Sequence, residues 1–468
     1  MAFLGTLTSF LLLFTHIIHN ARAASIHPLC GSNITIDNVQ PVAKSVTDLT
    51  ALFHGLELPE GACIFNPALV QVSGPLYCLF GRIYEASEPG KRCAPGRMDR
   101  PPFLDGWRGK STNILAILWL RQDPNRRRLQ TKLMGHTYIN ASNHEDGRLF
   151  KDSRGRIYVY LALPIGVYPK RAVINTVNRV FIQCNRSSSH CAVSLGYPRI
   201  LSFLGSDNAM DKNWVPWNGS EYMSFSHYGT FGPHSVFNWG SYDEPVLHID
   251  FDSVAEDSLF PNFNKHYGHL LQLSGGSPVV LEPGGKSYLG VGHFKAHPGC
   301  FHPEAMPAWV DKSRFGHMVG QLGTNCAHLQ QSSNETTRSE VLRVAFNFLH
   351  EGKEGIHYPL DYGFFFYRFN AAAPHNITHI SHGVIPYTWR NASDHQGIVF
   401  PTGLERLGSD TYIIAYGDED QASKLMTISA RRVEALLWPL PKMEQSLDTY
   451  TVCAIGCEGE EGGRCSYE

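Results

Sequence analysis

The sequence contains no long block of charge of one sign. Its 40 lysine and arginine residues nearly balance 42 aspartate and glutamate residues, so the net charge is −2. Proteins that bind nucleic acid or an anionic membrane surface usually carry a basic face. Here a short basic run, Arg126-Arg127-Arg128, is more typical of a solvated loop. We therefore expect no nucleic-acid partner.

Long apolar runs are also missing beyond the N-terminus. The stretch from Phe3 to Ile18 is mostly apolar and is followed by Ala21-Arg22-Ala23, a small-x-small cleavage pattern. This predicts a signal peptide over residues 1–23. Because no positive charge precedes the apolar stretch, an uncleaved anchor is the alternative. No other segment approaches the ~20 apolar residues of a membrane helix, so we expect no membrane span in the mature chain.

Two further features favour the secretory pathway. Acceptor triplets for N-glycosylation occur at seven asparagines: Asn33, Asn140, Asn185, Asn218, Asn334, Asn376 and Asn391. The 11 cysteines are expected to pair mostly as disulfides, with one left free or intermolecular. Cys184 and Cys191 flank the polar loop CNRSSSHC and are the best local pair, while the three C-terminal cysteines lack the nearby histidines of a zinc site. The sequence thus predicts a secreted or Golgi-lumenal glycoprotein.

Breakers of regular structure are abundant, with 43 glycines and 28 prolines, which favours many short strands over long helices. One helix is predicted over residues 41–58, from an apolar stripe formed by Val42, Val46, Leu49, Leu52, Phe53 and Leu56. After Ala62, strand follows strand. We expect an N-terminal extension over residues 24–61, a β-propeller over 62–435 with an irregular insertion at about 294–339, and a cysteine-rich tail over 436–468.

Four hairpins share one order of a small or Pro-containing entry, a strand, a tight turn, a second strand and a polar exit. They are NPALVQVSGPLYCLFGR, HEDGRLFKDSRGRIYVYLA, GGSPVVLEPGGKSYLGVGH and FPTGLERLGSDTYIIAYGD. Such repeated sheet units predict an all-β propeller. In that architecture the inner strand of each blade brings its polar end residues to one central pocket. A stacked β-sandwich, the alternative, would spread them along an edge.

Polar residues near these strands suit carbohydrate chemistry. Reaction at a glycosidic bond needs a proton donor at the bridging oxygen and groups that hold sugar hydroxyls, and a phosphate needs fixed cations. The candidates are Asn66, Arg82, Glu145, Asp146, Arg148, Lys212, Asn213, Trp214, His234, His293, Asp418, Glu419 and Asp420. A structural role is favoured for His234, and a loop position for Asp418 and Glu419. A turn cap at Asp146, a solvated Lys212 and a core Trp214 are the competing interpretations.

The order of several motifs resembles that of the mannoside phosphorylases and the related β-mannosyltransferases. The motifs are FNPAL…LYCLFGR, HEDGRLF…IYVYLA, DKNWVPW, GGSPVVLEPGGKSYLGVGH, IVFPTGL and YIIAYGDED, within residues 62–429. The resemblance implies a five-bladed propeller. The family's EDPR motif corresponds to residues 145–148, which implies that Asp146 is the proton donor and that Gly147 stands where the family has proline.

The same resemblance implies roles for four other residues. Lys212 matches a phosphate-binding lysine, and Asp420 matches an aspartate that holds a sugar hydroxyl. Asn66 matches a residue at the sugar-binding end of the first blade. His293 matches a histidine at the end of the GGSPVVLEPGGKSYLGVGH hairpin.

Together these features predict an enzyme that transfers a mannosyl-type sugar, with inversion, between a phosphate-bearing sugar and a glycan acceptor. The donor is a sugar phosphate or a nucleotide sugar. No cofactor or metal motif is evident, although a nucleotide-sugar donor leaves a divalent-metal requirement open. One alternative is an inverting glycoside hydrolase, for which the possible bases are Asp99, Asp105, Glu221 and Asp250. The other is a non-catalytic lectin or adaptor.

Overall fold

The structure is a computed structural model, and it describes residues 40–53, 56, 58, 62–84, 111–123, 129–139, 144–165, 172–185, 190–204, 212–227, 230–241, 249–255, 271–296, 361–381, 383–386, 399–418, 422–445 and 452–457. The predicted signal peptide lies outside these residues, as do Glu419, Asp420 and the predicted insertion from residue 297 onward, whereas residues 294–296 belong to a strand. Within the described ranges, no helix has the length and apolar character needed to cross a membrane.

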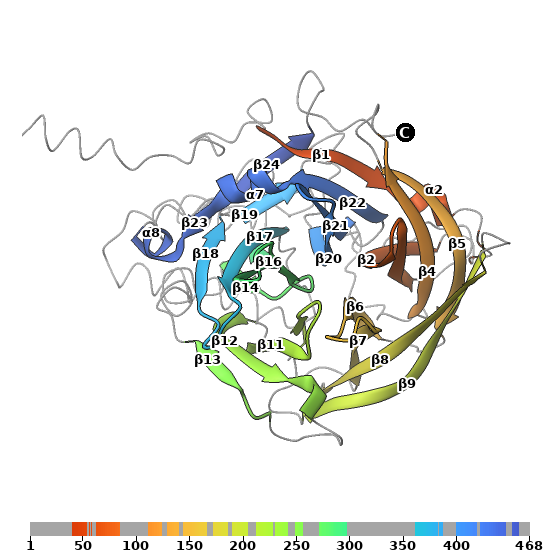
Figure 1. The fold of residues 1–468 in the computed structure, drawn as a ribbon, viewed down its shortest axis with the longest axis horizontal. Coiled ribbons are helices and arrows are strands. Elements are labelled where there is room, and N and C mark those ends of the chain that lie inside the picture. The colour runs from red at the N-terminus through yellow and green to blue at the C-terminus, as the bar shows by residue number, and fades with distance from the viewer. Residues whose placement is uncertain are drawn as a thin grey trace, which may run out of the picture.

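The described strands form five antiparallel blades around a central axis (Figure 1). Blade 1 contains β2 (Cys63–Ser73), β3 (Leu76–Tyr84), β4 (Ser111–Gln122) and β5 (Leu129–Ile139). Blade 2 contains β6 (Glu145–Lys151), β7 (Ile157–Ile165), β8 (Ala172–Asn185) and β9 (His190–Leu204). Blade 3 contains β10 (Val215–Pro216), β11 (Tyr222–His227), β12 (Thr230–Asn238) and β13 (Ser253–Ala255). In each blade the first strand is the innermost.

Blades 4 and 5 are joined into one continuous sheet. Blade 4 contains β14 (Leu271–Ser274), β15 (Val280–Leu281), β16 (Ser287–Ala296), β17 (Asp361–Asn370), β18 (Ile377–Ser381) and β19 (Gly383–Pro386). Blade 5 contains β20 (Val399–Leu407), β21 (Thr411–Asp418), β22 (Ala422–Ser429) and β1 (Gln40–Asp48). Strand β24 (Val452–Cys457) pairs in parallel with both β19 and β1 and so connects the two blades.

The remaining elements lie at the edges of the sheets. They are α2 (Thr50–Phe53), the 3-10 helix η3 (Trp239–Ser241), α7 (Ala430–Leu436), β23 (Leu437–Pro439) and α8 (Leu440–Gln445). Strand β23 pairs with β18 and extends the outer side of blade 4.

The four predicted hairpins are confirmed as the inner strand pairs of blades 1, 2, 4 and 5. Their turns contain glycines with positive φ, at Gly74, Gly155, Gly284, Gly285 and Gly408. Glycine adopts this backbone conformation without steric cost, which is why the turns were readable from the sequence.

The helix predicted over residues 41–58 is wrong for most of its length. Residues 40–48 form β1, which pairs antiparallel with β22, and only Thr50–Phe53 are helical. The partner strand lies about 380 positions away in the sequence, and Val46 faces Met426 across the ladder. Pairing with this edge satisfies the backbone groups of β22. The stabilisation from this pairing outweighs the helical preference that the local apolar pattern indicates. The propeller therefore includes residues on both sides of the expected 62–435 range.

The hydrophobic core is divided into five clusters, each of which lies between two neighbouring blades. Phe80 of blade 1 packs with Leu149 of blade 2, for example, and Leu425 of blade 5 packs with Leu69 of blade 1. Five interfaces for five blades mean that the ring is closed, so each sheet has both faces covered. Burial of these faces is the main stabilising contribution.

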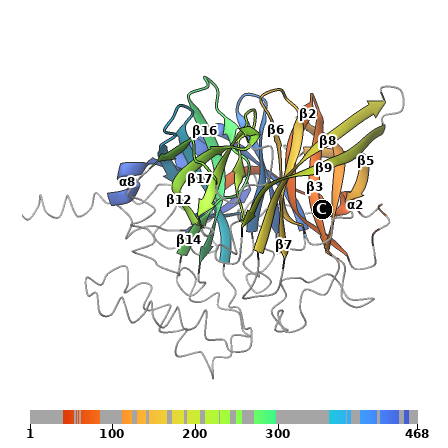
Figure 2. The ribbon, with the colours of Figure 1, turned by 90° about the horizontal axis from the view of Figure 1, so that it is seen from below.

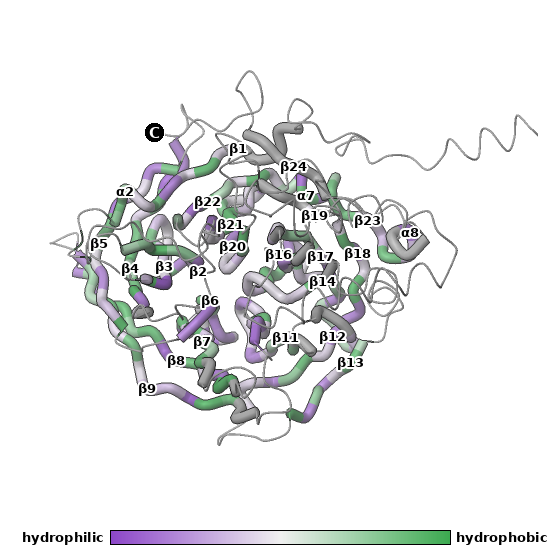
Figure 3. Tube along the Cα trace, turned by 180° about the vertical axis from the view of Figure 1, so that it is seen from behind, coloured by the Kyte–Doolittle hydropathy of each residue, from purple (hydrophilic) through white to green (hydrophobic). Residues whose placement is uncertain are grey.

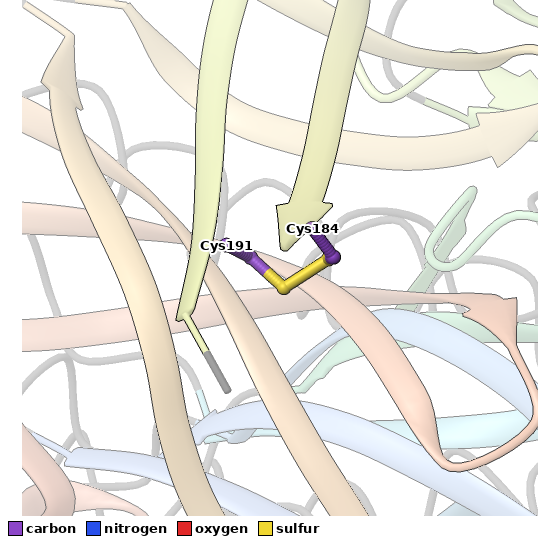
Figure 4. The surroundings of a disulfide bond; sticks show 2 residues. All are labelled: Cys184 and Cys191. Carbon is purple, nitrogen blue, oxygen red and sulfur yellow. A yellow bond between two sulfur atoms is a disulfide. The ribbon is translucent and has the colours of Figure 1, made fainter. Parts of the chain in front are cut away.

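The predicted disulfide between Cys184 and Cys191 is present and joins the ends of β8 and β9 (Figure 4). This end of the hairpin extends beyond the neighbouring strands (Figure 2). The backbone of Cys191 lies so close to Gly135 of β5 that a Cβ there would come within 1.8 Å of its carbonyl oxygen. The bond thus fixes the hairpin where it packs on blade 1. Cys78 is a free, buried cysteine.

At the turn end of the axis, four innermost strands meet at Asn218. Its Nδ2 donates to Glu405 of β20 at 3.0 Å, and its Oδ1 accepts from the backbone N–H of Lys151 in β6 at 3.0 Å. The backbone N–H of Asn218 donates to Val279, next to β15, at 2.9 Å. Asn218 itself follows β10, so a single residue connects blades 2, 3, 4 and 5.

The buried Glu405 gives the fold a predicted pH dependence. Burial raises the pKa of the Glu405 carboxyl from 4.5 to about 7, despite the opposing charge of Lys151. The folded state then holds a proton that the unfolded state releases, so stability should fall as pH rises from about 4.5 to about 7, by up to about 3 kcal/mol. Urea unfolding at pH 5 and pH 8 measures this difference. Glu405→Gln should remove that contribution, and an unchanged pH slope in the variant would contradict the prediction.

Candidate active site

At or just before the entry of three innermost strands, a polar residue has the same unusual backbone conformation. Asn66, Asp146 and Asn213 have φ values of 49°, 53° and 71°. The strand ladders slip at the first two positions, between Phe65 and Ala68 and between Glu145 and Arg148. Asparagine and aspartate tolerate positive φ better than other side chains, and a bulge re-aims the side chain that it carries. Bulges at Asn66 and Asp146, and the positive φ of Asn213 just before β10, thus place three polar residues at the same end of neighbouring blades.

A cluster of charges surrounds Asp146 and combines three blades. Lys212 Nζ, just before β10, lies 2.7 Å from Glu145 Oε2 and 3.0 Å from Asp146 Oδ2. Arg82 Nη2, from β3, lies 3.1 Å from Glu145 Oε1. Figure 3 shows a hydrophilic stretch of β6 close to the centre of the ring. The convergence that the propeller interpretation predicted is therefore present for these four residues, which we call the charge cluster.

The carboxylates of the charge cluster are held in their ionised form. Burial alone would raise the pKa of Asp146, but the positive charges of Lys212 and Arg148 outweigh it and hold this pKa well below its usual range. Burial acts in the same direction on Glu145, and Lys212 and Arg82 likewise lower its pKa. For Lys212 the two carboxylates outweigh burial and raise the pKa of the ammonium. Glu145, Asp146 and Lys212 therefore carry their charges at neutral pH.

Arg148 is fully buried, and its donors are directed at the protein. Its Nε donates to the carbonyl oxygen of Gly276 at 2.5 Å, and its Nη1 to that of Asp146 at 2.7 Å. Its Nη2 is 3.4 Å from Asn213 Oδ1. The guanidinium therefore ties blade 2 to blades 3 and 4 and fixes the bulge that carries Asp146. The contribution of Arg148 to the site is its charge and this positioning.

An aromatic group adjoins Arg148. Phe400, at the start of β20, lies with its ring centroid 5.1 Å from the Arg148 guanidinium and 4.7 Å from the His293 ring. His293 Nδ1 lies 2.6 Å from the carbonyl oxygen of Gly275, so this nitrogen carries the proton and donates. Phe400 was not among the predicted site residues, because a phenylalanine at a strand entry is indistinguishable from core in the sequence.

Asn66 packs against blade 5. Its Oδ1 would lie 2.0 Å from a Cβ added to Gly417, so glycine is required there. Asp418, the last residue of β21, is buried and forms an ion pair with Lys424. The interpretation of Asp418 as a loop acid is therefore wrong: the residue is in a strand, at the same end of the blade as Asn66. Asp420, predicted to hold a sugar hydroxyl, lies outside the described residues.

Two predicted aromatic and histidine positions belong to the core. Trp214 has no exposed surface and packs against Tyr160, Phe225 and Phe237, which matches the core interpretation rather than an open sugar-stacking face. His234 is buried: its Nε2 is 2.8 Å from Ser224 Oγ, and its Nδ1 is 2.8 Å from the His375 carbonyl oxygen. Burial lowers the pKa of His234 to about 4, so it is a neutral structural histidine, as expected.

Close packing against Phe80 explains why residue 147 is glycine, where the EDPR motif has proline. A Cβ at this position would lie 2.3 Å from the Phe80 ring of blade 1, so proline would collide with it as well. Gly147→Ala should therefore destabilise the protein by about 1–3 kcal/mol through overpacking, measured by urea unfolding. Adding Phe80→Leu should recover part of that loss, whereas strictly additive effects of the two changes would contradict the proposed contact.

In the part of the chain that the structure describes, no group of three or more His, Cys, Asp or Glu side chains is arranged to hold a metal ion.

No protein-family model matches the chain, and no curated protein matches it. Among solved structures it is similar to MPT-1, a GDP-Man-dependent mannosyltransferase from Leishmania mexicana, at 12% identity and a TM-score of 0.41, over 83% of this chain and 90% of that one. It is also similar to a β-1,2-mannobiose phosphorylase from Listeria innocua, at 11% identity and 0.40, over 84% and 98%. A glycosyl hydrolase from Bacteroides ovatus follows at 11% and 0.41, over 86% and 93%.

These structures include both activities of the family that the sequence motifs resemble. The similarity is distant, and the five blades are established by the strand pairing of this chain itself.

Proposed function

We propose that the protein is a carbohydrate-active enzyme that transfers a mannosyl-type sugar, with inversion, between a phosphate-bearing sugar and a glycan. The charge cluster is the observation that carries this proposal. Together with Arg148 it contains three cations and two carboxylates, which leaves one net positive charge at the centre of the ring. Such a site suits an anionic group next to an uncharged sugar.

Lys212 and Arg82 are the residues proposed to meet the phosphate. Lys212 keeps 27% of its side chain exposed and Arg82 keeps 5%, whereas Arg148 is fully covered. A phosphate at Lys212 competes with Glu145 and Asp146 for the same ammonium. Asn66, whose buried Oδ1 has no hydrogen-bond partner in the described structure, and Asn213 are proposed to hold sugar hydroxyls.

Asp146 is proposed to serve the bridging oxygen, either directly or through a sugar hydroxyl. In the free enzyme its carboxyl is ionised, because the neighbouring cations keep its pKa low. A bound phosphate adds negative charge and draws Lys212 away, and both effects raise the pKa of Asp146. Binding of the anionic substrate would thus convert a carboxylate into a competent proton donor, and no separate acid is needed.

An inverting hydrolase is less well supported. It needs a second carboxylate ~6.5–9.5 Å from the acid. Glu221 accepts a hydrogen bond from Ser153 Oγ at 2.5 Å. Ser153 follows the far end of β6, and the strand between it and Asp146 is roughly 20 Å long, so Glu221 is too far away to act as the base. Asp250 is exposed next to β13, on the outside of blade 3. Asp99 and Asp105 lie outside the described residues.

Incubation with β-mannosides, with and without inorganic phosphate, tests the proposal. Inverting phosphorolysis would give an α-linked mannose 1-phosphate, which proton NMR distinguishes from free mannose. Release of mannose in phosphate-free buffer would instead support the hydrolase. If neither product forms, GDP-mannose with a glycan acceptor tests the transferase direction. Binding of sugar without turnover of any of these substrates would support the lectin or adaptor.

A further inference from the structure

Three of the seven glycan acceptor asparagines lie within the described residues, in contrasting surroundings. Asn185 ends β8 next to the Cys184–Cys191 disulfide and is exposed. Asn376 is exposed in the turn between β17 and β18. Asn218 is half-buried at the turn end of the axis. The same acceptor triplet therefore occurs with an exposed asparagine at two positions and with a half-buried one at the third.

The amide of Asn218 is engaged on both atoms. Its Nδ2, the atom to which an N-linked glycan is attached, donates to Glu405 at 3.0 Å, and Glu405 is only 7% exposed. Its Oδ1 accepts from the backbone of Lys151 at 3.0 Å. The next residue, Gly219, donates its backbone N–H to the Lys151 carbonyl oxygen at 2.8 Å. A sugar on Nδ2 would occupy the space of Glu405 and separate β20 from β6.

Asn376 offers the opposite environment. The turn is fixed by its backbone, since the Asn376 carbonyl oxygen accepts from the Asn370 N–H at 3.0 Å. The hydroxyl of Thr378, the third residue of the triplet, donates to the Arg368 carbonyl oxygen at 3.2 Å. The native turn therefore needs nothing from the exposed Asn376 side chain, so an attached glycan would leave it intact.

We propose that Asn376 and Asn185 carry N-linked oligosaccharides in the mature protein, whereas Asn218 stays unmodified and acts as an axial link between blades. The donor is an oligosaccharide on a polyprenyl diphosphate. The bond from Asn Nδ2 to sugar C1 forms, the bond from C1 to the diphosphate breaks, and one amide hydrogen leaves as a proton. This inference depends on passage through the secretory pathway and is independent of the proposed enzymatic function.

The test is expression of the full chain in a eukaryotic secretory cell line. The folded protein is deglycosylated with peptide N-glycosidase in isotope-labelled water, which marks each formerly occupied asparagine, and the three peptides are read by mass spectrometry. Label on Asn376 and Asn185 but not on Asn218 is expected. Label on Asn218 in folded protein, or its absence from both other sites, would overturn the inference.

Variants separate occupancy from folding. Asn376→Gln and Asn185→Gln should each abolish one mobility shift and leave the melting temperature unchanged. Asn218→Gln should abolish no shift but should lower the melting temperature, because the longer side chain misplaces the amide. Ser220→Ala is the matched control, since it removes the acceptor triplet and keeps the Asn218 amide. A mobility change in Ser220→Ala would show that Asn218 is glycosylated and would contradict the proposal.

Discussion

Replacing Asp146 with asparagine should reduce turnover about a thousand-fold and change the affinity for a sugar phosphate only a few-fold. A positioned proton donor contributes about 10²–10⁴ in rate, and asparagine cannot supply the proton. Asparagine also adopts positive φ readily, so the backbone at φ 53° should persist. Lys212 keeps its contact with Glu145 at 2.7 Å, so the phosphate-binding cation remains in place. Steady-state kcat and KM with the active substrate distinguish the loss of turnover from a change in affinity.

A matched control is Glu282→Gln. Glu282 is also an ion-paired carboxylate, 2.7 Å from Arg368 Nε, but it lies in the β15–β16 turn at the opposite end of its blade. Its neutralisation should leave kcat unchanged. Equal losses in the two variants would mean that Asp146 acts through stability, and unchanged turnover in Asp146→Asn would remove it as the proton donor.

Replacing Arg148 with methionine should lower the free energy of unfolding by about 3–5 kcal/mol, the typical cost of removing one partner from a buried charged network. Methionine approximates the volume of arginine, but the carbonyl oxygens of Gly276 and Asp146 lose their buried hydrogen-bond donor. Arg148→Lys should recover only part of the loss. The planar guanidinium of arginine contacts three blades at once, and the compact ammonium of lysine cannot do so. Chemical denaturation of the purified variants measures both.

Arg156→Met is the control for Arg148. Arg156 pairs with the buried Asp152 within one blade and keeps 36% of its own side chain exposed. The backbone N–H groups of Arg154 and Arg156 also donate to the Asp152 carboxylate, so the loss of the Arg156 side chain should cost much less stability than the loss of Arg148. A similarly small loss for Arg148→Met would show that the three-blade contact does not stabilise the hub. In that case the Asp146 bulge must be held by the surrounding strand pairing alone.

The contrast between Arg148 and Lys212 shows where sequence reasoning was limited. Both are basic residues in recognisable motifs, and both were predicted to offset negative charge. Only the structure separates them, because Arg148 is enclosed by blades 2, 3 and 4 while Lys212 keeps part of its side chain exposed. Likewise, Trp214 is a core residue whose burial depends on strands that the local sequence does not specify.

The sequence by itself determined the strand hairpins, the turns between them, the Cys184–Cys191 disulfide and the polar motifs at the strand entries. These depend on alternation with a period of two, on glycine at positive φ and on short spacings, all of which act over a few residues. The tertiary structure alone decided that residues 40–48 become the outer strand of blade 5 and that Glu145 meets Lys212. It also decided that Asn218 closes the axis. These contacts exist only once the ring has closed, since they join residues that are between 67 and several hundred positions apart.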